Sequence, residues 1–403
     1  MSKTSTEMNK SRQRLTEILI FCIVIFTGLS AAGVAAVATP DGYATGTTGG
    51  GSATPVTVTT ADEFKAAATQ RDDPAVIIVK GRLDVGNVRI RSNKTIIGAD
   101  SGSGLYGGRV RITGKNCIFQ NLTFGPSDID AVELSGANRI FLHKCEFYDG
   151  ADGLLDIVRM SDYITVSWCK FYYVNQTEHN QVSLVGNGRK EDAGKLHVTL
   201  HHNWYTQRCH SVMPFVRYGQ VHIYNNYYSS TGNEFCIGIG AHSRIRVENS
   251  CFDNVKGAWE DLDGIANDGQ MGRAGLKMVN TSTPLFAPNL FPVFKLPYSY
   301  SMDPVDQVKD MVTAGAGNVF GNGTGGPEGY QFCCKEGQTC TFSGTVNLAY
   351  GANGRFHFLK NVTGGSISCD NDTFGDPIYN VEKACYIQQV SDDPDHSQSA
   401  DIK

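Results

Sequence analysis

The sequence predicts an all-β solenoid, and three observations indicate it. A seven-residue unit of short β-alternation that ends on an aromatic residue occurs six times, with starts 23, 24, 34, 23 and 24 residues apart. One strand-rich coil per 20-odd residues is typical of a solenoid, whereas a β-propeller blade needs about 40 residues. The sequence lacks the longer stretches of 3.6-residue periodicity that a helical solenoid requires. The 45 glycines among 403 residues fit a turn-rich β architecture. The units are Ile118–Phe124, Phe141–Phe147, Thr165–Phe171, Thr199–Tyr205, His222–Tyr228 and Arg246–Phe252.

Residues 1–38 are expected to be a cleavable signal peptide. A basic segment precedes an apolar run from Leu15 to Ala38, and the run ends in the small-residue sequence Ala36-Val37-Ala38. The apolar run is long enough that a signal anchor is the alternative. We expect a secreted, extracellular protein that has no membrane contact after cleavage. The basic residues are Lys3, Lys10, Arg12 and Arg14.

Secretion is compatible with the glycosylation motifs and the cysteine content. Removal of residues 1–38 takes away Cys22 and leaves an odd number of cysteines, so at least one thiol is expected to stay unpaired or to pair with another chain. The chain also holds N-x-S/T sequons, which favour a secreted glycoprotein. Past residue 38 the sequons begin at Asn93, Asn121, Asn175, Asn280, Asn322, Asn361 and Asn371.

The order of segments follows from composition. Residues 39–55 are rich in Gly, Thr and Ser and predict a flexible linker. Residues 56–325 carry the solenoid, and 326–390 predict a small Cys-rich β module, either a carbohydrate-binding unit or a structural cap. The polar tail 391–403 is expected to be disordered.

A helix is expected just before the solenoid. Thr60 can cap it, and Glu63 stands three residues later as in a capping box.

Stacked coils place equivalent residues about 4.8 Å apart. Asn121, Asn225 and Asn249 hold the fourth position of their units, where an Asn side chain can bond the backbone of a bend. Cys145 and Cys169 hold the fifth position in neighbouring coils. They predict either a disulfide or a pair of buried free thiols.

Four aspartates form the first chemical signal. Asp128 and Asp130 stand two residues apart, and Asp152 and Asp156 follow in the next coil. Stacking brings such carboxylates together, and they then need a cation or shifted pKa values. Hard oxygen ligands favour Ca²⁺. The net charge of -5 argues against nucleic-acid binding, and no zinc-like Cys/His spacing is found.

Residues from about 90 to 256 resemble the pectate lyases of polysaccharide lyase family 1. This resemblance implies a right-handed parallel β-helix that cleaves de-esterified homogalacturonan (polygalacturonate) by calcium-assisted β-elimination. The matching segments are Asp130-Ala-Val, Asp152-Gly-Leu-Leu-Asp156-Ile, Asp162-Tyr-Ile-Thr-Val-Ser167, Val182-Ser-Leu-Val-Gly186, Val198-Thr-Leu-His-His-Asn203 and Val216-Arg-Tyr-Gly-Gln-Val-His-Ile-Tyr-Asn-Asn226.

The resemblance assigns calcium ligands by position. Asp130, Asp152 and Asp156 match the family's ligands, and Asp128 matches an auxiliary acidic position. His201, His202 and His222 are expected to be hydrogen-bonded solenoid residues rather than ligands.

The expected basic residues are partly lost. The family has Lys where this chain has Gln181, its base Arg where this chain has Val212, and a further Arg where it has Phe215. Arg217 remains, and we expect it to bind a substrate carboxylate or to pair with acids of the cleft.

Two nearby side chains are alternative candidates for the catalytic base. Arg208 belongs to a Thr-Gln-Arg tripeptide displaced along its loop, and His210 has a side chain that titrates near neutrality.

The sequence therefore predicts a secreted, monomeric, calcium-dependent pectate lyase with a pectic polysaccharide as its partner. One alternative is a non-catalytic protein that binds polygalacturonate through calcium. The other is a glycoside hydrolase on a similar solenoid, which needs an acid and a base carboxylate about 5–9.5 Å apart.

Overall fold

The structure is a computed structural model, and it describes residues 37–175, 179–262, 264–282, 292–318, 327, 330–352, 355–377 and 383–390. Most of the predicted signal peptide and the whole tail 391–403 lie outside these ranges. Among the described residues, no helix is both long and apolar enough to cross a membrane.

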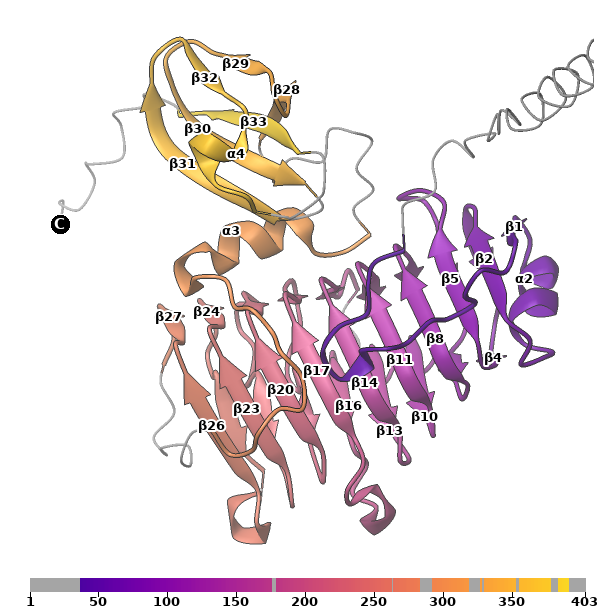
Figure 1. Ribbon diagram of the computed structural model, residues 1–403. Coiled ribbons are helices and arrows are strands. Elements are labelled where there is room, and N and C mark those ends of the chain that lie inside the picture. Colours follow the sequence, from indigo (N-terminus) through magenta and orange to yellow (C-terminus); the bar gives the residue numbers. More distant parts are fainter. Residues whose placement is uncertain are drawn as a thin grey trace, which may run out of the picture. The chain divides into compact units, whose positions relative to one another are not determined.

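Three parallel sheets form the body of the fold, and successive strands pass from one sheet to the next (Figure 1). We call them sheets A, B and C. Parallel crossovers of this kind are right-handed as a rule, and the solenoid predicted from the repeat is confirmed.

In the described part of the chain, sheet A has ten strands, and their order in the sheet is their order along the chain. They are β1 Pro55–Val58, β2 Ala75–Val79, β5 Lys94–Gly98, β8 Lys115–Gln120, β11 Asn138–His143, β14 Asp162–Ser167, β17 His197–His201, β20 Gln220–Tyr224, β23 Arg244–Glu248 and β26 Gln270–Ala274.

Sheet B has nine short strands among the described residues. They are β3 Arg82–Asp84, β6 Gly104–Tyr106, β9 Thr123–Phe124, β12 Glu146–Tyr148, β15 Lys170–Tyr172, β18 Trp204–Tyr205, β21 Tyr227–Tyr228, β24 Cys251–Asp253 and β27 Lys277–Val279.

Sheet C has eight strands within the ranges that the structure describes. They are β4 Val88–Ile90, β7 Val110–Ile112, β10 Val132–Ser135, β13 Leu155–Val158, β16 Ser183–Val185, β19 Phe215–Val216, β22 Ile237–Ile239 and β25 Trp259–Asp261. Short 3₁₀ turns lie at η1 Gly42–Ala44, η2 Lys190–Asp192 and η3 Ile265–Asn267.

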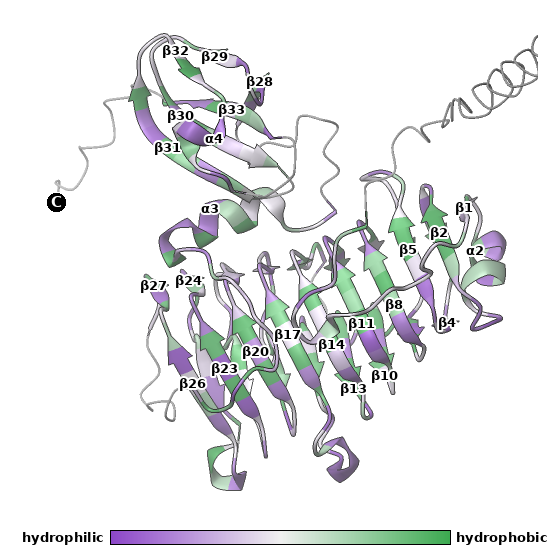
Figure 2. Cartoon of the chain, viewed as in Figure 1, coloured by the Kyte–Doolittle hydropathy of each residue, from purple (hydrophilic) through white to green (hydrophobic). Residues whose placement is uncertain are grey.

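The aromatic residue that ends each repeat unit forms a continuous stack inside the solenoid. Neighbouring rings lie 4.5–5.2 Å apart, from 5.2 Å between Phe124 and Phe147 to 4.5 Å between Tyr228 and Phe252. Each such pair contributes about 0.5–1.5 kcal/mol beyond the burial of its area. The aromatic period read in the sequence is therefore the period of the core, and hydrophobic residues recur along the strands (Figure 2).

Polar residues also stack in register. The amide of Asn203 accepts the backbone N–H of Cys169 at 2.9 Å, and that of Asn226 accepts the N–H of Asn203 at 2.7 Å. Asn121, Asn225 and Asn249 stand at the bends with φ of 55°, 51° and 39°, a conformation that Asn tolerates better than most residues.

Cys145 and Cys169 are free buried thiols. The backbone N–H of Cys145 donates to the Cys169 sulfur at 3.4 Å. Of the two alternatives, the structure therefore shows packed thiols and no disulfide.

The prediction of a flexible linker is wrong. Residues 39–55 do not form a flexible linker, because η1 packs against the outer face of sheet A and buries Tyr43 and Ala44. The N–H groups of Tyr43 and Ala44 donate to the hydroxyls of Thr199 and Thr165, both at 3.1 Å. Small residues are needed here for close approach, so the composition that suggests flexibility instead allows packing. Figure 1 shows this segment in indigo across the strands.

The helix α2, Ala61–Ala68, begins as predicted. Thr60 accepts the N–H of Glu63, and the Glu63 side chain accepts the N–H of Thr60. The capping box is therefore confirmed, and it closes the solenoid beside β2.

A second helix, α3 Val305–Gly315, links the solenoid to the C-terminal module. Its Val308 and Val312 pack with Tyr227 and Cys251, and its Ala314 packs with residues of the module such as Tyr386.

The C-terminal module is antiparallel and Cys-rich. Disulfides join Cys333 to Cys340 and Cys369 to Cys385, while Cys334 is free. Its elements are β28 Gln331–Lys335, β29 Thr339–Thr341, β30 Thr345–Ala352, β31 Arg355–Thr363, β32 Ser366–Ser368, α4 Asn371–Phe374 and β33 Ala384–Gln389.

Candidate active site

Three of the four predicted aspartates, Asp130, Asp152 and Asp156, come together near the N-terminal ends of strands of sheet C. Asp130 stands before β10, Asp152 before β13, and Asp156 is the second residue of β13. The N–H of Asp152 donates to the carbonyl of Ile129 at 3.3 Å, which joins the two coils. Asp130 is buried, Asp156 is half-buried, and Asp128 and Asp152 are exposed.

Gly153 marks the point on which two of these carboxylates converge. A Cβ atom at this position would lie 3.2 Å from Oδ1 of Asp130 and 3.7 Å from Oδ1 of Asp156. Consecutive coils therefore aim carboxylate oxygens at one small region.

The convergence shifts the acid strengths of the group. Burial and the charge of Asp152 raise the pKa of Asp130 to about 6, although Arg109 opposes the shift. Burial and the charge of Asp130 raise the pKa of Asp156 to about 8, although the N–H of Leu184 opposes it. Carboxylates with raised pKa values hold negative charge at a free-energy cost, which a cation would relieve.

Glu133 and two arginines belong to the same cluster and were missed by the sequence analysis. Glu133 pairs in register with Asp156 on one side and Arg111 on the other. Its Oε2 lies 2.7 Å from Arg109 and 3.1 Å from Arg111, and Arg109 also lies 3.4 Å from Asp130. The signal in the sequence that could have identified Glu133 and Arg111 is that they stand in the same register as Asp156 in successive coils.

The donor set fits a hard cation by its chemistry. Every acidic group in the cluster offers oxygen, the ligand type of Ca²⁺. Among the described residues, Oε1 of Glu133 is buried and accepts no hydrogen bond. This carboxylate oxygen therefore has no hydrogen-bond donor, and it lies in the same cluster as two carboxyl groups of raised pKa.

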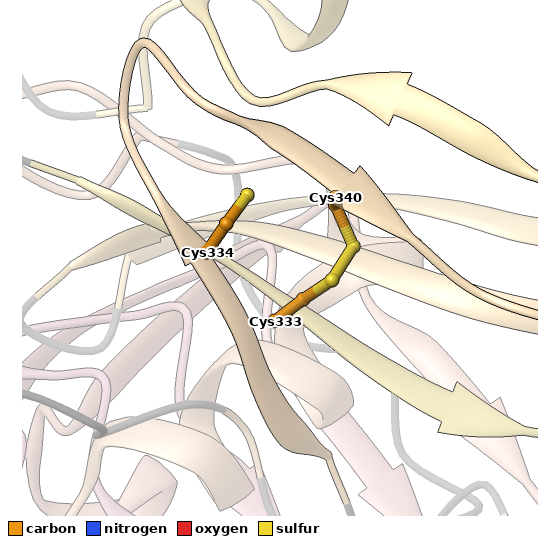
Figure 3. A group of neighbouring side chains, drawn as sticks. All are labelled: Cys333, Cys334 and Cys340. Carbon is orange, nitrogen blue, oxygen red and sulfur yellow. A yellow bond between two sulfur atoms is a disulfide. The ribbon is translucent and has the colours of Figure 1, made fainter.

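The aspartate oxygens do not form a closed cage. In the described part of the chain, the only groups of three or more possible ligand atoms within 4.8 Å of one another are cysteine groups in the C-terminal module. Figure 3 shows one of them, in which Cys333 and Cys340 are joined by a disulfide and Cys334 stands beside them. Disulfide sulfurs are not thiolate ligands, so this group is a covalent crosslink and not a metal centre.

Arg208 and His210 lie together in the loop after β18, and both are exposed. The Arg208 guanidinium donates to the carbonyl of Val174 in the neighbouring coil. His210 places Nε2 3.6 Å from Oε2 of Glu234. Among the described residues, neither side chain forms a hydrogen bond or ion pair with the four aspartates.

Arg217 directly follows β19, a strand of the same sheet that contains Asp156. Its guanidinium carbon lies 3.9 Å from the centre of the Phe215 ring, a cation–π arrangement. Burial lowers its pKa from the ordinary arginine value.

The positions where the resemblance places basic residues have two different surroundings. Gln181 is exposed and bridges to Ser211 of the next coil. Val212 and Phe215 are each 8% exposed and pack with Phe235, Leu184 and Leu262. An apolar cluster therefore stands beside the carboxylates.

Comparison with known proteins gives a consistent result. Residues 12–319 match the family described as pectate lyase. A pectate trisaccharide-lyase of a Thermotoga species is 31% identical over 359 residues, which cover 75% of this chain and 94% of the relative. Pectate lyase A of Emericella nidulans is 35% identical over 308 residues, covering 69% of this chain and 86% of the relative. A pectate trisaccharide-lyase of Thermotoga maritima is 34% identical over 53% of this chain and 63% of its own length.

Solved structures agree on the fold. A Bacillus subtilis pectate lyase superposes with a TM-score of 0.61 at 22% identity, over 72% of this chain and 99% of that one. A pectate lyase of another Bacillus species, solved with trigalacturonate, gives 0.59 at 27% identity, over 69% and 98%. The fold, the matched length and the relatives lead to one conclusion: this chain is a member of the pectate lyase family.

Proposed function

We propose that this protein is a polysaccharide lyase that cleaves polygalacturonate by β-elimination and uses calcium. The observation that carries the proposal is the convergence of Asp130 and Asp156 beside Gly153 on sheet C. Family membership and relatives called pectate lyase or pectate trisaccharide-lyase support the reaction and its substrate.

The aspartates have the role of holding calcium. Asp130, Asp152 and Asp156 are the proposed ligands, with Asp128 in support. Bound calcium would hold a substrate carboxylate and stabilise the negative charge that develops next to it. The raised pKa values of Asp130 and Asp156 support this role, because the neighbouring side chains do not balance the negative charge of the cluster.

The reaction needs a base and a group that orients the uronate. A base removes the proton on C5, the electron pair forms the C4–C5 double bond, and the C4 glycosidic oxygen leaves and is protonated. Arg208 and His210 are the candidate bases, and Arg217 is the candidate ligand of a substrate carboxylate. In the structure Arg208 contacts the Val174 carbonyl, so its action as base requires that contact to break.

The proposal includes secretion as a monomer after removal of residues 1–38. Sequons and the disulfides of the Cys-rich module support the secretion. Detection of the mature N-terminus in culture medium by mass spectrometry tests the cleavage.

Ultraviolet absorbance tests the reaction. The mature protein, incubated with polygalacturonate and calcium, is expected to form an unsaturated uronide that absorbs in the ultraviolet, and a chelator is expected to abolish the rise. Calcium-dependent binding without this product would favour the non-catalytic alternative. New reducing ends without the chromophore would favour the hydrolase.

Two variants test the base. Arg208→Ala is expected to abolish product formation, and Val212→Arg to enhance it. Unchanged activity in Arg208→Ala would transfer the role to His210, and His210→Ala is then expected to be the inactive variant.

A further inference from the structure

A cavity of about 400 Å³ lies where the chain turns from sheet C into sheet A. It is formed at the starts of β17, β20 and β23 and in the loop before β17, so it shares no residue with the aspartate cluster. Small-molecule sites in proteins have volumes of about 300–1,000 Å³, and the cavity is therefore large enough for a ligand. Its polar and aromatic side chains are Lys195, His197, Tyr218, Gln220, His242 and Arg244.

The solenoid repeat arranges these side chains in two rows. The first row consists of the first residue of each strand, and the register pairs them in the order His197, Gln220 and Arg244. Neighbours in such a row are about 4.8 Å apart, so the row is about 10 Å long. The second row consists of the residues two positions earlier in the same coils, which are Lys195, Tyr218 and His242. A ligand that lies along the solenoid axis can therefore contact several of these groups at once.

Lys195 supplies one positive charge that a ligand can reach. Its side chain is 49% exposed, and its Nζ lies 3.8 Å from Oδ2 of Asp162. This distance is longer than a hydrogen bond, so the ammonium keeps its N–H groups for a ligand.

Arg244 supplies a second positive charge. Its side chain is 30% exposed, and Nη2 lies 2.7 Å from Oδ2 of Asp268, whose side chain is 59% exposed. An ion pair in such contact with water contributes little to stability. A ligand anion can therefore share the guanidinium with Asp268 or take its place at small cost.

The nearby acidic groups do not cancel these charges for a ligand. Among the described residues, no aspartate or glutamate lines the cavity. Asp162 is 2% exposed, and its Oδ1 accepts from Nδ1 of His197 at 2.7 Å and from the N–H of His197 at 3.0 Å. Asp192, in the loop before β17, is fully buried. A ligand in the cavity therefore meets cations first, which favours an anion.

The rest of the lining suits a sugar ring. The rings of Tyr218 and His242 have their centres 4.8 Å apart and offer an aromatic surface to the C–H face of a sugar. The amide of Gln220 donates to the Tyr43 hydroxyl at 2.7 Å, and this bond leaves the amide oxygen able to accept from a sugar hydroxyl. A uronate unit carries a carboxylate, hydroxyls and a C–H face, and the cavity has a partner for each.

We propose that this cavity is a second polysaccharide site, which binds uronate units through Lys195 and Arg244 without calcium. The inference rests on the proposed function for its ligand class, because an acidic polysaccharide is the proposed substrate. Two sites that hold one polymer chain raise the effective concentration of the polymer at each of them. The cavity therefore has the role of keeping the polymer on the protein between reactions.

Calorimetric titration in chelator tests the site, because the proposed calcium site cannot fill under these conditions. The mature protein at pH 7 and fixed low salt is titrated with a galacturonate hexamer. Wild type is expected to bind it, and Lys195→Gln and Arg244→Gln are each expected to raise the Kd about tenfold. Lys195→Gln is the cleaner variant, because Asp162 keeps its bonds to His197.

A matched control removes the same charge from the same loop. Lys190 in η2 is exposed and does not line the cavity, so Lys190→Gln is expected to keep the wild-type Kd within about twofold. A neutral galactose hexamer and inorganic sulfate are both expected to bind at least about tenfold more weakly than the galacturonate hexamer. Circular dichroism verifies the fold of each variant.

Several outcomes would overturn the site. They are no binding of the galacturonate hexamer by wild type, an unchanged Kd in Lys195→Gln, or an equal loss in Lys190→Gln. Equally tight binding of the neutral hexamer or of sulfate would overturn recognition of a uronate.

The second site and the proposed function fail in different ways. Unsaturated product in calcium together with an unchanged Kd in Lys195→Gln overturns the second site while the lyase stands. Binding in chelator that depends on Lys195, without unsaturated product in calcium, overturns the lyase while the second site stands.

Discussion

Two carboxylates on different sheets of the same solenoid have opposite environments. Glu248 in sheet A accepts from His222 at 2.9 Å, from Arg246 at 2.6 Å and from Tyr300 at 2.8 Å, and these bonds lower its pKa to about 2. Burial and the neighbouring charge raise the pKa of Asp156 in sheet C to about 8. The fold completes the first environment with its own side chains, whereas the second stays short of positive charge, which the proposed calcium would supply.

The covering of sheet A explains the difference. Two segments, one before the solenoid strands in the sequence and one after them, cross the outer face of sheet A. The first contributes Tyr43 and the second Tyr298. The Tyr298 hydroxyl bonds Thr199 at 2.7 Å and His222 at 2.8 Å. His201 and His202 also find carboxylates, Asp41 at 3.1 Å and Asp303 at 2.7 Å. The expectation that these histidines are hydrogen-bonded solenoid residues is confirmed.

The largest expected effect comes from Asp156→Asn. Removal of one proposed calcium ligand is expected to lower lyase activity at least about 100-fold, in the range of losses for a preorganised charge at a reacting centre. Without calcium the variant is expected to be at least as stable as wild type, because the repulsion with Asp130 is gone. Product absorbance and thermal unfolding in chelator measure the two effects; a large loss of stability would contradict this view of the cluster.

Glu248→Gln is the counterpart on the covered face. It is expected to lose about 2–3 kcal/mol of stability at neutral pH, because a charge held by three donors is replaced by a neutral amide. The lowered pKa means that this contribution is present above about pH 4.5 and is lost as pH falls toward 2. Urea unfolding at pH 7 and pH 3 checks it: the gap between wild type and variant should narrow at the lower pH, because part of the contribution is lost there.

The opposite sign is expected for the acidic cluster. Because the folded pKa values of Asp130 and Asp156 are raised to about 6 and 8, their contribution to stability is present at pH 4 and is lost as pH rises toward 8. Saturating calcium at 100 times its Kd is expected to restore about 2.7 kcal/mol. Thermal unfolding from pH 5 to 8, with calcium or chelator, measures this; a calcium effect independent of pH would contradict it.

The smallest effect concerns the segment that covers sheet A. Gly42 has φ of 56°, and a Cβ there would lie 2.7 Å from Oγ1 of Thr199. Gly51 has φ of 58° with nothing within 4 Å of its Cβ position. Both Ala variants carry the backbone cost of about 1 kcal/mol, so Gly42→Ala is expected to lose about 1 kcal/mol more than Gly51→Ala. Equal losses would show that the close packing of η1 has no energetic weight.

Much of the fold could be predicted from local sequence. The aromatic residue at the end of each unit predicted the internal stack, and Thr60 with Glu63 predicted the start of α2. Residues 39–55 could not be read this way, because their small side chains serve packing against Thr165 and Thr199, which lie more than 100 positions away.

The candidate site also contains residues that the sequence could identify and residues that it could not. Asp130, Asp152 and Asp156 could be named from their motif, since the family resemblance assigns them directly. Glu133, Arg109 and Arg111 could not, because their membership depends on the register between coils. The roles of Arg208 and His210 as bases stay predictions. The structure adds that Arg208 contacts the Val174 carbonyl and that His210 lies near Glu234, and each contact would have to break.

The sequence by itself determined the repeat, and with it the solenoid and the coil that carries each aspartate, because a periodic chain has one efficient way to bury its periodic side chains. Only the tertiary structure decided which face is covered and which carboxyl groups have raised pKa values. It also decided that Val212 and Phe215 form an apolar cluster beside the acidic one. Such properties depend on neighbours that are distant in the chain, and pKa shifts and desolvation arise only when those neighbours meet.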